Sequence, residues 1–182
     1  MGILLGFTPF ILFTLITDLS VSLALWVSFA AAFAIGIRDF LHAKMVRTLD
    51  AGCLVLFAIL ALYAGFIQPS MTVQAVRMIA DLGLFLLALV SLGLKSPFTL
   101  QYARDEVPEA EWEAPEFLRA NYTLTGVWAG AFFVMATADG FATFSAETPF
   151  ALDIAVGLAA LAFAIVFTVR WAGVPMRGNT PR

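Results

Sequence analysis

Residues 72–94 read TVQAVRMIADLGLFLLALVSLGL, a 23-residue stretch in which Arg77 and Asp81 are the only charged residues. At a rise of about 1.5 Å per residue, a helix of this length can cross the roughly 30 Å hydrocarbon core of a bilayer. The apolar residues form a near-continuous run instead of alternating, which is typical of a membrane-spanning helix and not of a barrel strand. The stretch therefore predicts a helical membrane protein.

The rest of the chain has the same character. Of its 182 residues, 62% are hydrophobic and 13% are charged, whereas soluble domains are about 45–50% apolar and about 25% charged. We expect an all-α, polytopic bundle of about six transmembrane helices, forming a single domain over residues 1–182. The predicted spans are 2–17, 21–37, 51–67, 72–94, 120–138 and 149–171. The first is the shortest and contains Pro9, so it could re-enter the membrane instead of crossing it.

Positive charge predicts the orientation of these spans. If the amino terminus is cytoplasmic, the cytoplasmic segments hold nine of the ten Lys and Arg residues, and only Arg77 lies toward the other side. Such an excess of Lys and Arg marks the cytoplasmic face. Both termini are therefore predicted in the cytoplasm, together with an interfacial loop (residues 95–119) and a polar C-terminal tail (residues 172–182).

Four ionisable residues in or beside the spans form a candidate intramembrane polar site: Arg77, Asp81, Asp139 and Asp153. Charges in hydrocarbon are costly and usually face protein or water, so the set suggests an ion, proton or anionic-ligand site. The alternative is structural. Arg77 and Asp81 lie four residues apart on one helix face and can neutralise each other, while the remaining acids sit in water or cap their helices.

Gly126 and Gly130 are candidate helix-packing residues because they have GxxxG spacing. Two glycines four residues apart leave one helix face without side chains, so another backbone can approach closely. We expect this face to pack within the bundle, and a homo-oligomer is the alternative.

The loop over residues 95–119 contains a candidate partner-binding set, Glu106, Glu109, Trp112 and Glu113. Its aromatic residues predict a segment that lies at the membrane surface. Its six acidic residues are unusual beside an anionic cytoplasmic leaflet, which favours a basic protein partner. A solvated loop is the alternative.

No catalytic, cofactor or metal site is predicted. The chain has one histidine, His42, and one cysteine, Cys53, too few for a multi-ligand zinc site. The net charge of −3 and the scattered basic residues indicate no nucleic-acid partner. We therefore expect a non-enzymatic protein whose surroundings are a lipid bilayer.

The order of features resembles the bacterial inner-membrane septation-protein family, also called YciB or intracellular septation protein A. The residues that carry the resemblance are Pro9, Asp18, Lys95, Pro97, Trp128, Phe132 and Phe133. The resemblance implies a non-enzymatic multi-pass protein of the bacterial cytoplasmic membrane, which acts in cell-envelope maintenance or division through protein partners. A small transporter or channel that uses Arg77 and Asp81 is the alternative function.

Overall fold

A computed structural model of the chain describes residues 5–43, 47–145 and 150–172, and within them every regular element is helical. This confirms the all-α prediction, while the polar tail beyond Ala172 lies outside the described residues. The helices are α2 (Thr8–Ile16), α3 (Val21–Ala43), α4 (Thr48–Leu62), α5 (Val73–Gly93), α6 (Phe98–Ala103), α7 (Pro115–Phe144) and α8 (Phe150–Ala172). A π-helical turn (Tyr63–Ile67) extends α4, and two 3-10 turns (Arg104–Glu106 and Glu109–Glu111) follow α6.

Five helices are long and apolar enough to cross a membrane: α3, α4 with its π-helical turn, α5, α7 and α8. The first predicted span instead contains α2, which has nine residues and so covers about 14 Å, roughly half of a hydrocarbon core. The described part of that span does not cross the core by itself. By contrast, α7 is longer than predicted: it has 30 residues and extends past both ends of the predicted span 120–138.

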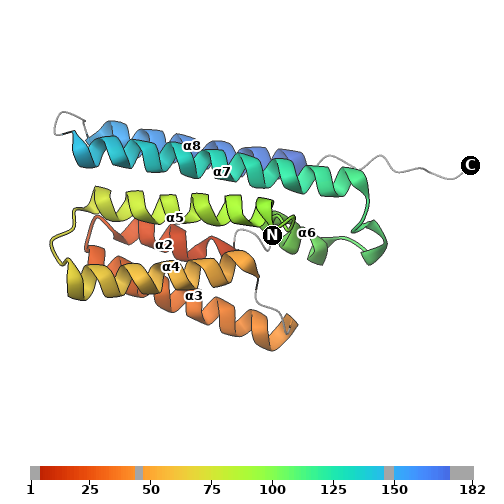
Figure 1. The fold of residues 1–182 in the computed structure, drawn as a ribbon, viewed down its shortest axis with the longest axis horizontal. Helices are drawn as coiled ribbons and strands as arrows, with labels where there is room; N and C mark the ends of the chain where they lie inside the picture. Colours follow the sequence, from red (N-terminus) through yellow and green to blue (C-terminus); the bar gives the residue numbers. More distant parts are fainter. Residues whose placement is uncertain (1–4, 44–46, 146–149, 173–182) are drawn as a thin grey trace, which may run out of the picture.

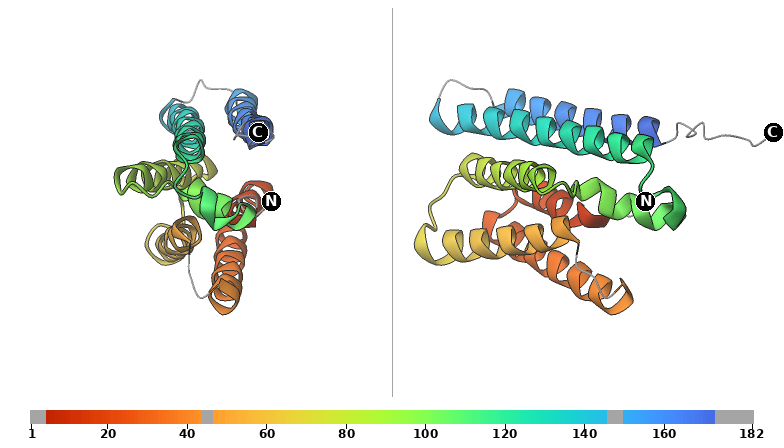
Figure 2. Two further views of the ribbon diagram at one scale, coloured as in Figure 1. Left: turned by 90° about the vertical axis from the view of Figure 1, so that its right-hand side faces the viewer. Right: turned by 45° about the vertical axis from the view of Figure 1, so that its right-hand side comes forward.

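The helices lie in a layered arrangement along one common direction (Figure 1). α7 and α8 form one side of the bundle, α3 and α4 form the other, and α5 lies between them with the short α2 beside it (Figures 1 and 2). α5 packs against both α7 and α4, while α2 packs against α3. This places the charged residues of α5 in the middle of the molecule.

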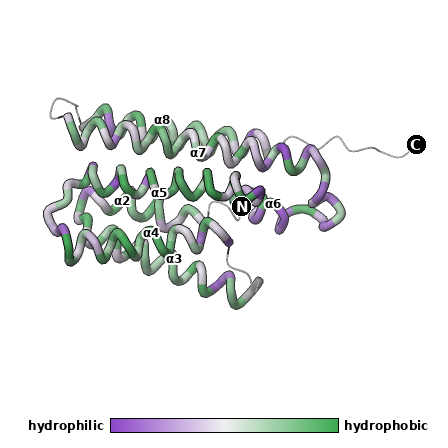
Figure 3. The backbone as a smooth tube through the Cα atoms, viewed as in Figure 1, coloured by the Kyte–Doolittle hydropathy of each residue, from purple (hydrophilic) through white to green (hydrophobic). Residues whose placement is uncertain are grey.

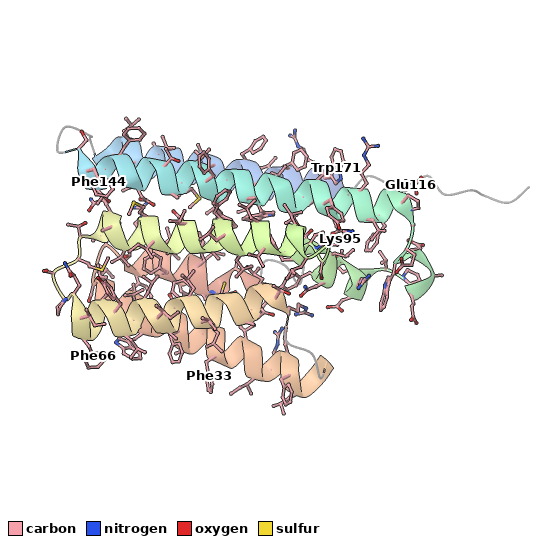
Figure 4. All side chains as sticks on the ribbon, viewed as in Figure 1. Phe33, Phe66, Lys95, Glu116, Phe144 and Trp171 are labelled. Carbon is pink, nitrogen blue, oxygen red and sulfur yellow. The ribbon has the colours of Figure 1, made fainter. Side chains whose placement is uncertain are left out.

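The two ends of the bundle differ in polarity. Lys95, Glu116 and Trp171 lie at one end, which we call the loop end, and Phe66 and Phe144 lie at the opposite end, which we call the far end (Figure 4). Hydrophilic colouring is concentrated at the loop end, around α6 and the turns that follow it (Figure 3). The helix bounds place six described basic residues at the loop end: Arg38, Arg47, Lys95, Arg104, Arg119 and Arg170.

An aromatic cluster around Trp128 holds α2 against the bundle. The Trp128 ring stacks on Phe7, with ring centroids 4.2 Å apart, and lies 5.7 Å from Phe132. Its Nε1 donates a hydrogen bond of 3.0 Å to Thr168 Oγ1 of α8. Phe7 also meets Phe98 of α6 edge-on at 6.0 Å. One side chain of α7 therefore joins α2 and α8, and through Phe7 it reaches α6.

The glycines that tighten the bundle are not those of the GxxxG motif. A Cβ atom added at Gly52 of α4 would overlap Leu87 of α5, and one added at Gly83 of α5 would overlap Leu56 of α4. A Cβ at Gly126 or Gly130 would have no atom within 4 Å outside its own helix. The described part of the chain therefore leaves the GxxxG face open, contrary to the expected packing within the bundle.

The two kinds of glycine should respond differently to alanine. We expect Gly52→Ala and Gly83→Ala to lower the free energy of unfolding in detergent micelles by about 1–3 kcal/mol, because the added methyl group must displace a packed leucine. Gly126→Ala and Gly130→Ala should leave it unchanged or raise it slightly, since alanine favours a helix over glycine. Equal losses at all four positions would show that the GxxxG face is packed in the native protein.

Candidate functional site

Four charged residues from three helices meet inside the far half of the bundle. We call this set the Arg77 centre: Arg77 and Asp81 of α5, Asp139 of α7 and Asp153 of α8. Thr72 caps α5, with its hydroxyl accepting a hydrogen bond of 3.2 Å from the Ala75 amide. The cap fixes the first turn of α5, and Arg77 follows in the next turn.

The Arg77 guanidinium binds carboxylates on two neighbouring helices. Its Nε lies 3.3 Å from Asp139 Oδ1, and its Nη1 lies 3.7 Å from Asp153 Oδ2. Gly157 of α8 lies beside it, and a Cβ there would be in ordinary van der Waals contact with Nη2, at 3.6 Å. Arg77 therefore connects α5 to α7 and α8.

This pairing differs from the expected one. The sequence predicted that Arg77 and Asp81 neutralise each other, with Asp139 and Asp153 at watery helix ends. Instead, Arg77 forms its ion pairs with Asp139 and Asp153, whose side chains are 2% and 1% exposed. The difference arises because α7 continues to Phe144 and carries Asp139 inside the bundle, opposite α5.

The Arg77 centre contains more negative than positive groups. One guanidinium faces three carboxyl groups, and Asp81 is as deeply buried as Asp139 and Asp153. Among the described residues, no donor forms a well-directed hydrogen bond to any carboxyl oxygen of Asp139 or Asp153. Buried carboxylates normally have such donors, so these oxygens are available to a further ligand.

A cavity reaches the centre from the side of α2. It has a volume of about 170 Å³, and its wall includes Thr14, Asp18, Arg77 and Asp81. Asp18 lies in the exposed turn between α2 and α3, so the cavity runs from the far end toward Asp81. Thr14 and Asp18 are polar groups along this path.

A second buried cluster lies at the loop end and was not predicted. Arg47, just before α4, forms ion pairs with Asp39 of α3 and with Asp105, which follows α6. It also lies 3.9 Å from Asp50 in the first turn of α4. We call these residues, with Tyr102, the Arg47 cluster. Arg47 thereby connects α3 and α4 to the segment after α6.

Tyr102 completes the Arg47 cluster from α6. Its hydroxyl donates a hydrogen bond of 2.8 Å to Asp50 Oδ1, and the Arg47 guanidinium lies 4.6 Å from the centre of its ring. Burial, and next the charge of Asp50, raise the pKa of the Tyr102 phenol above its usual value. The phenol therefore remains a hydrogen-bond donor over the physiological pH range.

Hydrogen bonds attach α6 to the ends of two spans. Gln101 Nε2 donates to Thr48 Oγ1 at 2.7 Å, and its Oε1 accepts from the Thr48 amide at 2.7 Å. Thr99 Oγ1 lies 2.8 Å from Thr125 Oγ1 and 2.9 Å from the Asn121 carbonyl oxygen, both in α7. The predicted surface loop thus begins as a helix packed into the bundle.

The predicted partner-binding residues fall into two groups. Glu106, Glu109 and Glu113 are exposed. Trp112 is half-buried: its Nε1 donates to the Arg104 carbonyl oxygen at 3.2 Å, and its ring lies 5.2 Å from the Arg104 guanidinium. Trp112 therefore folds the segment instead of presenting an open aromatic surface.

The loop aromatics do not lie at the membrane surface as expected. The other three aromatic residues of the loop, Phe98, Tyr102 and Phe117, are buried against the bundle. The short α6 turns Phe98 and Tyr102 inward, and the first turn of α7 does the same for Phe117, a geometry that the three prolines of the segment obscured in the sequence.

The Arg47 cluster left little signal in the sequence. Asp39, Arg47 and Asp50 come from two helix ends, where charged residues usually sit in water. Tyr102 follows about 50 residues later, in a segment whose hydrophobic residues show no clear periodicity. Asp50 directly precedes the predicted span 51–67, and nothing in the sequence indicated that it would be buried.

Among the described residues, no group of three or more His, Cys, Asp or Glu side chains is arranged to hold a metal ion. The chain matches no protein-family model, no curated protein and no solved structure. The septation-family resemblance therefore stays a prediction, and the chemistry of the chain has to be argued from the two buried clusters and from the loop end.

Removing the guanidinium of the Arg77 centre should destabilise the protein. We expect Arg77→Met to lower the free energy of unfolding in detergent by about 3–5 kcal/mol, because buried carboxyl groups lose the one cationic partner that the described residues give them. Arg119→Met, at an exposed position of α7, should change it by about 0.5 kcal/mol or less.

The double variant Arg77→Met/Asp139→Asn should recover part of this loss, because the uncompensated charge is also removed. Chemical or thermal unfolding followed by circular dichroism measures all three variants. A loss at Arg77 no larger than at Arg119 would contradict the role assigned to the ion pairs.

Proposed function

We propose that this chain is a multi-pass protein of the bacterial cytoplasmic membrane that acts without catalysis, through proteins that bind its loop end, in cell-envelope maintenance or division. Five helices with the length and composition of membrane spans support the membrane part of the proposal. The observation that carries the rest is the folded segment 98–112, which we call the platform.

The platform is attached to the bundle at several points. Gln101 pairs with Thr48, Tyr102 bonds to Asp50, and Asp105 forms an ion pair with Arg47. These contacts fix α6 and the start of the following turn against the ends of α3 and α4. A surface that is held in place before binding loses less conformational entropy on binding, which favours a docking role over that of a solvated loop.

The outward face of the platform and the start of α7 is strongly acidic. The exposed acidic residues are Asp105, Glu106, Glu109, Glu111, Glu113 and Glu116. Such a surface is repelled by an anionic leaflet and attracts basic protein surfaces, which raises the rate and selectivity of association. A basic segment of another membrane or division protein is the partner that fits this charge.

The proposed orientation places the loop end in the cytoplasm, with both termini on that side and six spans if the first block crosses. It is supported by the six described basic residues at the loop end and by Arg77 being the basic residue of the far half. The bacterial setting and the division role are supported by the resemblance to septation proteins in Pro9, Asp18 and the Trp128 region.

Reversing the charge of the platform should abolish partner binding. In the native host, with a photo-crosslinking amino acid at position 110, we expect the crosslinks formed by the wild-type chain to disappear in Glu109→Lys/Glu111→Lys/Glu113→Lys. Because these side chains are exposed, the membrane level of the protein should not change. Crosslinked products are identified by mass spectrometry, and cell length is scored by microscopy.

The matched control is Glu109→Gln/Glu111→Gln/Glu113→Gln, which should retain part of the binding because it removes attraction without adding repulsion. In Ala110→Cys/Cys53→Ala, an impermeant maleimide should label the protein only after the cells are opened. Normal crosslinks and cell length in the lysine triple variant would contradict the platform, and labelling in intact cells would contradict the orientation.

A small transporter or channel is the second candidate function. The observation that favours it is the Arg77 centre, where a buried excess of carboxyl groups adjoins a cavity of about 170 Å³. Intramembrane ionisable residues of this kind often lie on ion pathways. The two proposals use opposite ends of the molecule, so they can be tested separately.

If the chain transports protons, the proton flux should depend on Asp81. In liposomes with a pH-sensitive dye, the wild-type protein should dissipate a pH gradient faster than empty liposomes, and Asp81→Asn should reduce this rate to the background. Glu116→Gln, at an exposed position near the start of α7, is the control and should keep the wild-type rate. Equal rates for liposomes with the wild-type protein and without protein would exclude proton transport.

A further inference from the structure

The Arg77 centre has an excess of negative charge. Arg77 can compensate one of the three carboxylates of Asp81, Asp139 and Asp153, which are all buried. Two further uncompensated negative charges in an apolar interior would each cost several kcal/mol, and such groups normally take up a proton instead. A small positively charged ligand would lower this excess, and one bound proton reduces it from two charges to one.

Asp139 is the central carboxyl group of the three. It interacts with Asp81 on one side and with Asp153 on the other, and its Oδ1 lies 3.3 Å from Nε of Arg77, one helical turn before Asp81. Two ionised carboxylates are both acceptors and cannot bond to each other, whereas a carboxyl and a carboxylate can. A proton between Asp81 and Asp139 would also satisfy the oxygens of Asp139 that lack a donor.

We propose that the Arg77 centre is a proton-binding site, in which Asp81 and Asp139 share a proton that is exchanged with water at the far end. Uptake transfers a proton from a hydronium ion to a carboxylate oxygen of Asp81. One O–H bond forms, one water molecule is left, and the new hydroxyl donates to Asp139. Release is the reverse step, with water as the acceptor.

The cavity supplies the path for this exchange. Asp81 lies on its wall, and Asp18 lies on the same wall in the exposed turn between α2 and α3. A water molecule occupies about 30 Å³ in the liquid, so the volume of about 170 Å³ admits a short chain of water molecules. Thr14 and Asp18 can bond to such water from the α2 side.

The geometry favours a proton over a metal cation. The described carboxyl groups are not arranged as a metal site, and the Arg77 guanidinium already occupies the space beside Asp139 and Asp153. A sodium or calcium ion would need several oxygen ligands and would be repelled by that guanidinium. A proton needs only two facing oxygens.

Every charged side chain that faces the shared proton is accounted for in the described helices. Arg77 comes from α5, Asp153 comes from α8, and Asp18 lies at the end of α2. Burial is the main cause that favours a bound proton, the charge of Asp153 adds to it, and Arg77 opposes it.

This inference goes beyond the platform and deepens the transport alternative by naming the ion. It concerns binding at equilibrium, so an absence of proton flux would exclude transport and leave the binding site standing. Loss of the platform function would not affect it either, because the platform lies at the loop end.

Infrared difference spectroscopy of the full-length protein in lipid nanodiscs, recorded as a function of pH, tests the proposal. A protonated carboxyl group has its own carbonyl band, which shifts when H₂O is replaced by D₂O. We expect one such band in the wild-type protein, and we expect it to be lost in both Asp81→Asn and Asp139→Asn. The exposed-site control Glu116→Gln should keep the band.

The variant Asp81→Glu is the control for misfolding. It keeps a carboxyl group on the same helix face, so it should keep a band at a shifted frequency. A band that survives in both asparagine variants, or no D₂O-sensitive band in the wild-type protein, would overturn the proposal. A band that disappears on adding sodium at constant pH would overturn it in favour of a metal-cation site.

Discussion

The indole ring of Trp128 is the contact on which the arrangement of helices depends. It stacks on Phe7 before α2, lies against Phe132 of its own helix, and bonds to Thr168 of α8. The nine-residue α2 is too short to be stable alone, and this contact adds to its packing against α3 and to the contact of Phe13 with Phe57 of α4. The position of α2 in turn forms one wall of the cavity beside Asp81, so the aromatic cluster sets the surroundings of the Arg77 centre.

Both buried clusters follow one pattern, in which a single arginine faces several carboxyl groups from different helices. Arg47 binds Asp39 and Asp105, while Arg77 binds Asp139 and Asp153. They differ in how the remaining acid is satisfied. Tyr102 donates to Asp50 Oδ1, while Asp50 Oδ2 receives no hydrogen bond from the described residues. Neither carboxyl oxygen of Asp139 or Asp153 receives one, so the Arg77 centre has more unsatisfied carboxyl oxygens than the Arg47 cluster.

The long apolar helices could be predicted from the sequence because their length and apolar content identify them, as in residues 72–94. The ends of the helices were harder to predict from the sequence. A charged residue normally predicts the end of a span, but α7 continues to Phe144 because Asp139 is paired inside the bundle. The partners of Arg77 depend on the rotation of α7 and α8 about their axes, which a single sequence does not contain. For the same reason, the GxxxG spacing of Gly126 and Gly130 did not reveal which way that face points.

The length of α7 has a mechanical consequence. Its 30 residues make a rod of about 45 Å, longer than the roughly 30 Å of hydrocarbon around it. The rod begins next to the platform and carries Asp139 near its other end, with no proline after Pro115 to interrupt it. A tilt imposed on α7 at the loop end would therefore move the carboxyl group that Arg77 holds. One rigid helix thus connects the proposed docking surface to the Arg77 centre.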